Sequence, residues 1–223
     1  MEYEKILRQA ADKIKIDRTV PMVNNDMNLI NESRYELNKS GTKYVCVGLS
    51  PQILFTPAVK ICGNKSRGVI FNRNEWCALV ENQGIITNYF YSVDSPWVPM
   101  KIGSKTIYFE TINKTKVIRV VDFLDVEIYL GWESLEQLWK ILNIVAYRII
   151  CLAELNFNSF YNNVVNVVVD MVGDVKENIN QIIIPLQDVY DEKVSCMMEV
   201  VEFAANKLYG DIEHAKNFGS SSK

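Results

Sequence analysis

The chain has 223 residues, of which 48% are hydrophobic, so it can bury one large core or two small ones and lacks the composition of a disordered protein. No apolar run reaches the ~18 residues that a membrane-spanning helix needs, and the charged start of the chain is not typical of a signal peptide. The net charge of −3 hides an asymmetry, because residues 43–120 carry 10 basic and 4 acidic side chains whereas residues 121–223 carry 7 and 16. The basic segment suggests a polyanion as partner, although the charges could simply keep both parts soluble.

The first 42 residues predict an N-terminal helix and an arm. Residues 2–16 have the apolar spacing of a short amphipathic helix. Residues 17–39 are polar and rich in asparagine, which predicts a loop or arm with at most a turn of helix near residues 29–37.

The following segment predicts two successive groups of short strands, each ending in a helix, with proline and glycine at the breaks. The first group is expected as strands over residues 44–49, 52–55, 58–62 and 69–71, then a helix over residues 73–83 that stops at Gly84. The second is expected as strands over residues 85–91, 97–102, 105–112, 117–123 and 126–130, of which 97–102 and 105–112 are either separate or one bent strand. A long helix then begins near Glu133.

The remaining residues keep a helical pattern as far as Lys216, interrupted at Pro185. Residues 164–169 are β-branched and could equally form a strand, although a helix is favoured. The sequence therefore predicts an α+β protein in which two ββββα repeats form a pseudo-two-fold sheet core. The expected domains are an N-terminal helix and arm (residues 1–42), the duplicated core (43–150) and an acidic helical extension (151–223).

The two strand-to-helix corners are similar in sequence. Each corner places an acid, Glu75 or Glu133, just ahead of a large apolar residue that opens the helix. Four apolar positions of the first corner align with four of the second: Val69, Phe71, Trp76 and Leu79 with Ile128, Leu130, Leu135 and Leu138. Chance similarity of two amphipathic segments is the alternative explanation.

The first corner resembles the strand-into-helix signature of the transcriptional coactivator positive cofactor four. That family has a ββββα unit that pairs two-fold and binds single-stranded DNA. A chain with two such units is similar to the Whirly and PUR proteins, and the resemblance covers residues 43–150. It implies a sheet surface that binds single-stranded nucleic acid.

The sequence offers little for catalysis. Its single histidine, His214, argues against a zinc site or a histidine-based triad, and its cysteines have no metal-ligand spacing. Asp122, Asp125 and Glu127 cluster, but a metal-dependent nuclease needs carboxylates that converge from more than one segment, and no phosphate-binding glycine pattern is present. We predict a non-enzymatic protein without cofactor or metal. Five cysteines without a secretory signal indicate a reducing compartment, either nuclear or cytoplasmic.

The strands contain the residue types that a single-strand binder needs, because cations neutralise phosphates and aromatic rings stack on bases. The candidate cations are Lys60, Lys65, Arg67, Arg73, Lys101, Lys105, Lys114, Lys116 and Arg119. The candidate stacking residues are Tyr89, Tyr91, Tyr108 and Tyr129, and alternation places Tyr129 on the face opposite the helices. The alternative is that the aromatic residues fill the core and the cations are ordinary surface residues.

We therefore predict a protein that binds single-stranded DNA or RNA, with DNA favoured, at low sequence specificity. A homo-oligomer is expected, a protein partner could bind the acidic C-terminal helices, and no membrane partner is expected. The rival prediction is a structural or interaction protein that oligomerises through its sheet and its long apolar helix. Convergence of Lys60, Arg67, Lys101, Lys116 and Arg119 on one sheet face would favour nucleic-acid binding, and scatter would favour the rival.

Overall fold

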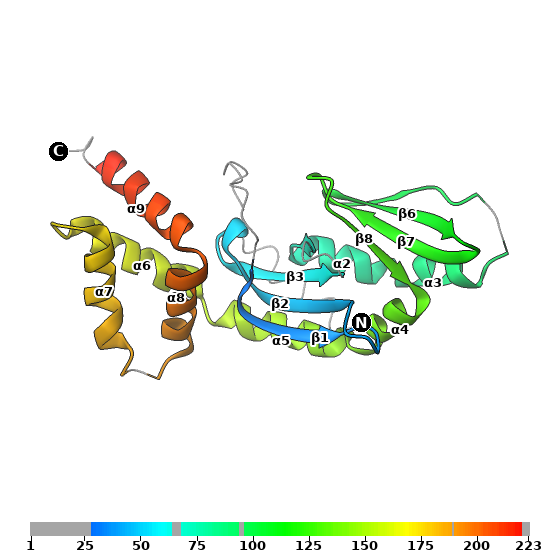
Figure 1. The fold of residues 1–223 in the computed structure, drawn as a ribbon, viewed down its shortest axis with the longest axis horizontal. Helices are drawn as coiled ribbons and strands as arrows, with labels where there is room; N and C mark the ends of the chain where they lie inside the picture. The colour runs from blue at the N-terminus through cyan, green and yellow to red at the C-terminus, as the bar shows by residue number, and fades with distance from the viewer. Residues whose placement is uncertain (1–27, 64–67, 94–95, 189, 220–223) are drawn as a thin grey trace. The chain divides into compact units, whose positions relative to one another are not determined.

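The computed structural model describes residues 28–63, 68–93, 96–188 and 190–219. The predicted N-terminal helix over residues 2–16 lies outside this range, as do Lys65 and Arg67. The protein is α+β, with two four-stranded antiparallel sheets and a set of C-terminal helices (Figure 1).

In each sheet the strands are neighbours in the order in which they occur in the chain, and two helices follow. The first group consists of β1 (Ile30–Glu36), β2 (Tyr44–Ser50), β3 (Thr56–Cys62), β4 (Val69–Phe71), α2 (Arg73–Glu81) and α3 (Gln83–Tyr91). The second group consists of β5 (Met100–Ile102), β6 (Lys105–Ile112), β7 (Thr115–Val121), β8 (Glu127–Gly131), α4 (Trp132–Lys140) and α5 (Leu142–Glu154). The C-terminal helices are α6 (Phe157–Asp170), α7 (Val175–Leu186), α8 (Glu192–Phe203) and α9 (Ala205–Gly219).

The last two strands of each sheet have the same register and lead into helices of matching position. Val59 lies opposite Phe71 in the first sheet, and Ile118 lies opposite Leu130, 59 residues later, in the second. The helices α2 and α4 also begin 59 residues apart, at Arg73 and Trp132. Each is followed by a second helix after a one-residue break, at Asn82 and Ile141. All the apolar positions that align at the two corners are buried.

Several elements differ from the sequence predictions. Residues 85–91 form α3 rather than a strand, because Ile86 and Tyr89 face the core at helical spacing. Gly84 does not end a helix, since it lies in the first turn of α3. The long helix predicted from Glu133 is broken at Ile141 into α4 and α5.

The first sheet also uses a different set of strands. Its edge strand β1 lies within the segment predicted as an arm. Alternate polar side chains of β1 are exposed, and the asparagine-rich composition of this segment is more typical of a loop than of a strand. Residues 52–55 are not a strand, because Pro51 opens a short 3₁₀-helix, η1 (Pro51–Ile53), and both Leu54 and Phe55 have left-handed backbones. Residues 97–102 and 105–112 contribute two separate strands, and residues 164–169 are helical, as favoured.

A buried ion pair connects α2 to the hairpin formed by β5 and β6. Asn72 and Glu75 form a capping box at the start of α2, with each side chain accepting a bond from the other residue's backbone N–H at 3.0 Å. The Glu75 carboxylate also accepts bonds from the Ser104 hydroxyl at 2.6 Å and from Lys105 Nζ at 2.7 Å. Burial raises the pKa of Glu75, but the bonds from Lys105 and Ser104 outweigh it, so the pKa is lowered and the carboxylate stays ionised.

Contacts within the chain divide it into two compact units. One contains Ser33–Val47 and Ala58–Tyr147, which includes the second sheet and helices α2, α3 and α4. The other contains Gly48–Pro57, the start of β1 and the helices that follow Arg148. In this second unit α6 packs against α7, α8 and α9, and the Phe55 ring contacts Phe157 and Tyr161.

Gly48 allows β1 to approach β2 closely. A Cβ at this position would lie 2.7 Å from Leu29 Cβ and 2.8 Å from the Ile30 carbonyl oxygen. Because the second atom is backbone, we expect Gly48→Ala to lower the free energy of unfolding by about 1–3 kcal/mol in urea denaturation. Gly84→Ala is the control, since no atom lies within 4 Å of its Cβ and alanine in a helix should stabilise by about 0.5–1 kcal/mol. Equal effects of the two substitutions would contradict this account.

Candidate nucleic-acid interface

Three of the predicted residues lie side by side across the second sheet. Tyr108 on β6 is opposite Arg119 on β7, which in turn is opposite Tyr129 on β8. Their strand neighbours Ile107, Ile118, Ile128 and Leu130 are buried, so alternation turns the row of Tyr108, Arg119 and Tyr129 to the other face. All three side chains are half-buried there. We call this row the tyrosine–arginine row.

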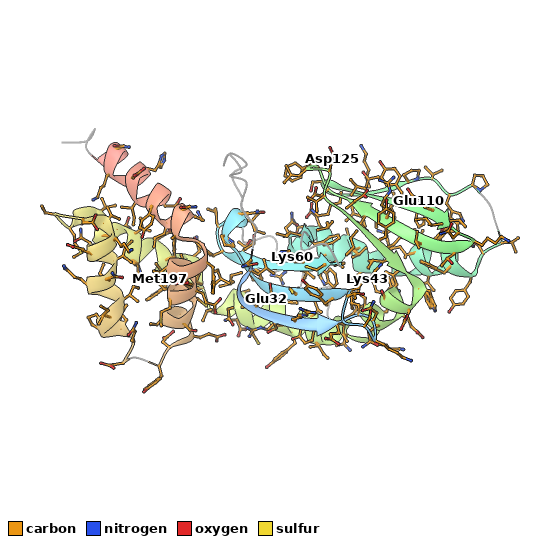
Figure 2. All side chains as sticks on the ribbon, viewed as in Figure 1. Glu32, Lys43, Lys60, Glu110, Asp125 and Met197 are labelled. Atoms are coloured by element: carbon orange, nitrogen blue, oxygen red, sulfur yellow. The ribbon has the colours of Figure 1, made fainter. Side chains whose placement is uncertain are left out.

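The row is part of a connected polar network. The Arg119 guanidinium lies over the Tyr108 ring, 4.4 Å from its centroid. Arg119 Nε donates to Glu110 Oε1 at 2.8 Å, and its Nη1 donates to Glu127 Oε2 at 3.3 Å. The Tyr129 hydroxyl donates to the other oxygen of Glu127 at 3.2 Å. Figure 2 labels Glu110 within this sheet.

These contacts fix the charge states of the row. The bond to Glu110 raises the pKa of Arg119, which therefore remains a cation at any physiological pH. Partial burial, followed by the negative charge of Glu127, raises the pKa of Tyr129, so its phenol stays neutral. A neutral ring beside a fixed cation is suited to stacking on a nucleobase.

The electrostatic character of this face is mixed. Lys101 is exposed and pairs with Thr106, so it lies on the same face as the row. Glu110 and Glu127 lie on that face as well, at alternate positions along β6 and β8. Among the described residues of this sheet face, two cations are therefore balanced by two carboxylates.

Three other predicted contact residues are bonded to neighbouring elements of the fold. Lys105 is buried against Glu75, and Tyr89 is buried with its hydroxyl donating to the Glu110 carbonyl. Lys116 lies on the face opposite Arg119 and donates to the carbonyls of Tyr89 and Ser92, where it neutralises the C-terminal end of α3. Lys105 stabilises the packing of α2 on β6, whereas Tyr89 and Lys116 stabilise the packing of α3 on the second sheet.

The remaining predicted residues are spread over the molecule. Lys60 on β3 (Figure 2) is only 8% exposed. Arg73 is half-buried at the start of α2, Lys114 is exposed in the turn between β6 and β7, and Tyr91 is exposed at the end of α3. Of the five cations whose convergence would favour nucleic-acid binding, Arg67 lies outside the described residues. Of the four that are described, Lys101 and Arg119 share one face of the second sheet, Lys116 lies on its other face, and Lys60 lies in the first sheet. By the criterion set out above, this scatter favours the rival prediction.

Comparisons with protein-family models, curated proteins and solved structures found no match for this chain. Within the described residues, no group of three or more histidine, cysteine or acidic side chains is placed to hold a metal ion. The helices of that same part of the chain are too short or too polar to cross a membrane. The candidate site is the tyrosine–arginine row, because three of the predicted residues meet there on one face of the second sheet.

Part of this site is not predicted by the sequence. Residue type predicts the three members of the row, but it gives no role to Glu110 and places Glu127 in a carboxylate cluster. Lys43 was also not selected, although its ammonium donates to the Tyr129 carbonyl and burial lowers its pKa. Strand register brings Glu110 and Glu127 beside Arg119, and a tertiary contact between residues 86 apart in the chain brings Lys43 to Tyr129. Neither arrangement can be read from residue type alone.

Proposed function

We propose that the protein binds single-stranded nucleic acid, single-stranded DNA above all, on the outer face of the β5–β8 sheet, and that it catalyses no reaction. The observation that carries this proposal is the tyrosine–arginine row. Tyr108 on β6 and Tyr129 on β8 are partly exposed aromatic rings on either side of Arg119 on β7. Such rings form a surface on which bases stack, because every base offers an aromatic face. The bases of a duplex are already stacked on one another, so this surface suits a single strand.

We also propose that the two halves of the core are copies of one ββββα-type unit. The common register of β3–β4 and β7–β8, and the matching breaks between the paired helices, support this. The arrangement agrees with the resemblance to the positive cofactor four, Whirly and PUR proteins. The proposed core of residues 43–150 is extended by β1. In the first half the position that corresponds to Arg119 is the buried Lys60, so the proposed binding surface lies on the second sheet.

The balance of charges on the face sets the mode of binding. With Arg119 paired to two carboxylates, the site contributes few phosphate contacts, and base stacking supplies most of the affinity. Each phosphate contact on a single strand adds roughly −0.7 to the slope of log binding constant against log salt concentration. We therefore expect a shallow slope of log affinity against log salt concentration, of about −0.7 for one contact by Lys101.

Alanine at Tyr108 or Tyr129 should weaken binding by about 1–3 kcal/mol each, because each substitution removes one stacking ring. The measurement is fluorescence anisotropy with labelled single- and double-stranded oligonucleotides at two salt concentrations. Tyr147→Ala is the matched control, since Tyr147 is 67% exposed on α5, away from the row in sequence and on a helix. If the wild type binds no single strand at low salt, or all three variants bind alike, this site is excluded.

One observation favours a second function, that of an interaction protein that forms homo-oligomers. Exposed apolar side chains occur on both α3 and α5, with Ile85 and Ile144 each 49% exposed and Tyr91 at 70%. Such side chains are candidates for a protein interface, and the scatter of the cations agrees with this reading. A wild type that fails to bind nucleic acid but forms a dimer or larger species in light scattering would favour it. A partner for the acidic C-terminal helices and a nuclear or cytoplasmic location stay predictions.

A further inference from the structure

The carboxylates of Glu110 and Glu127 occupy the one arginine of the tyrosine–arginine row. Glu110 binds Nε at 2.8 Å and Glu127 binds Nη1 at 3.3 Å, so both carboxylates lie where a phosphate would otherwise bind the guanidinium. The Glu110, Arg119 and Glu127 side chains are 31%, 25% and 45% exposed. An incoming nucleic acid therefore meets the carboxylates as well as the cation.

A carboxylate only accepts hydrogen bonds, so it repels a phosphate and offers it no donor. Duplex DNA presents mainly phosphates on its outside, and non-specific duplex binding depends on cations that neutralise them. A single strand can instead place unstacked bases on Tyr108 and Tyr129, which neither carboxylate opposes. The same two charges thus act strongly against a duplex and weakly against a single strand.

We propose that Glu110 and Glu127 determine the selectivity of this protein for single-stranded over double-stranded nucleic acid by denying phosphates access to Arg119. This inference rests on the proposed function and adds a discriminating role for two residues that do not stack on bases themselves. Glu110 is the stronger partner of Arg119. Glu127 holds the weaker bond and also accepts from the Tyr129 hydroxyl, so it repels phosphate over the ring of Tyr129 as well.

The experiment compares the wild type with Glu110→Gln, Glu127→Gln and the double variant. Glutamine keeps the size of the side chain and an oxygen that can accept from Arg119, while the repulsive charge is removed. Glu136→Gln is the matched control, because Glu136 is 49% exposed and pairs with Lys140 on α4. Dissociation constants are measured for one labelled sequence as a single strand and as a duplex, at two salt concentrations.

We expect the double variant to bind the duplex at least roughly tenfold more tightly than the wild type, because a like charge facing phosphate is removed. Affinity for the single strand should change by less, so the selectivity ratio falls. The salt dependence of duplex binding, measured as the slope of log binding constant against log salt concentration, should steepen by about 0.9, because one new phosphate contact forms. The control should keep the wild-type ratio and slope.

An unchanged ratio in the double variant, with single-strand binding still sensitive to Tyr108→Ala, would overturn this inference and leave the proposed function intact. A wild type that binds neither the single strand nor the duplex would instead contradict the proposed function itself. Tighter binding of both forms by the same factor would also overturn the inference, because the carboxylates would then lower affinity without discriminating.

Discussion

Replacing Lys105 with methionine should lower the free energy of unfolding by about 3–5 kcal/mol at neutral pH, the cost of leaving one charge of a buried pair uncompensated. Lys105 and Glu75 are 4% and 6% exposed and are joined at 2.7 Å. Methionine fills a similar volume but gives the Glu75 carboxylate no donor. Urea denaturation followed by tryptophan fluorescence suits this test, because Trp76, Trp97, Trp132 and Trp139 all belong to the same compact unit as the pair.

The loss of unfolding free energy in Lys105→Met should depend on pH. In the wild type the pKa of Glu75 is lowered by folding. The ionised Glu75 therefore stabilises the fold above the unfolded-state pKa of about 4.3, and this stabilisation is lost as the pH falls through the folded-state pKa. Without Lys105, burial is the dominant cause and should raise the pKa, so stability is lost as the pH rises through the new folded value. The difference between the two proteins should therefore be largest near pH 7 and smaller near about pH 4.

Two further variants make this test specific. Lys101→Met removes a cation from the neighbouring exposed position on β5 and should change stability by no more than about 0.5 kcal/mol. Adding Glu75→Gln to Lys105→Met should recover part of the loss, because it removes the stranded charge while glutamine can retain the capping box. If the loss of stability is the same at every pH, or if Lys101→Met loses as much, the ion pair is not the cause of the loss.

Phe55→Ala should destabilise the second compact unit by about 3–5 kcal/mol. The Phe55 ring is 3% exposed, and its centroid lies 4.5 Å from that of Tyr161 and 5.2 Å from that of Phe157. Its removal leaves a cavity beneath η1 where α6 contributes its two largest buried side chains. Far-UV circular dichroism during urea denaturation is the appropriate measurement, since most of this unit is helical.

Leu54→Ala is a close control for this prediction. Leu54 and Phe55 both have left-handed backbones, with φ of 57° and 53°, so the strain that alanine meets is the same in both variants. They differ in burial, because Leu54 is 43% exposed. We expect Leu54→Ala to cost under about 1 kcal/mol. If the two losses are equal, the backbone conformation rather than the aromatic cluster determines the importance of Phe55.

The sequence predicted those parts of the fold whose signal is local. Alternation along Ile128, Tyr129 and Leu130 identified β8 and placed Tyr129 on the outer face. The apolar residues at both corners are buried as their spacing indicated, and Glu75 opens α2 in a capping box. These features depend on neighbours within a few residues, so residue type and spacing are sufficient to find them.

Errors arose where distant residues determine the local structure. Residues 85–91 have an apolar, aromatic composition that suits a strand equally well, and the packing of Tyr89 against Trp97 and Phe109 favours the helix α3. The strand β1 was hidden because its polar side chains are exposed at an edge, while pairing with β2 supplies its backbone hydrogen bonds. Phe55 was assigned to a strand because its burial by α6 cannot be seen in its neighbours.

By itself, the sequence determined the α+β class, the two strand-to-helix corners and a set of cations and tyrosines suited to nucleic acid. Only the tertiary structure decided which of these residues meet. Lys105 and Lys116 are held by Glu75 and by the end of α3, whereas Tyr108, Arg119 and Tyr129 form one row beside Glu110 and Glu127. The physical reason is that a charged side chain makes its strongest interaction with the partner that strand register and burial bring to it. That partner lies up to 30 residues away in the chain for these pairs, beyond the reach of any local pattern.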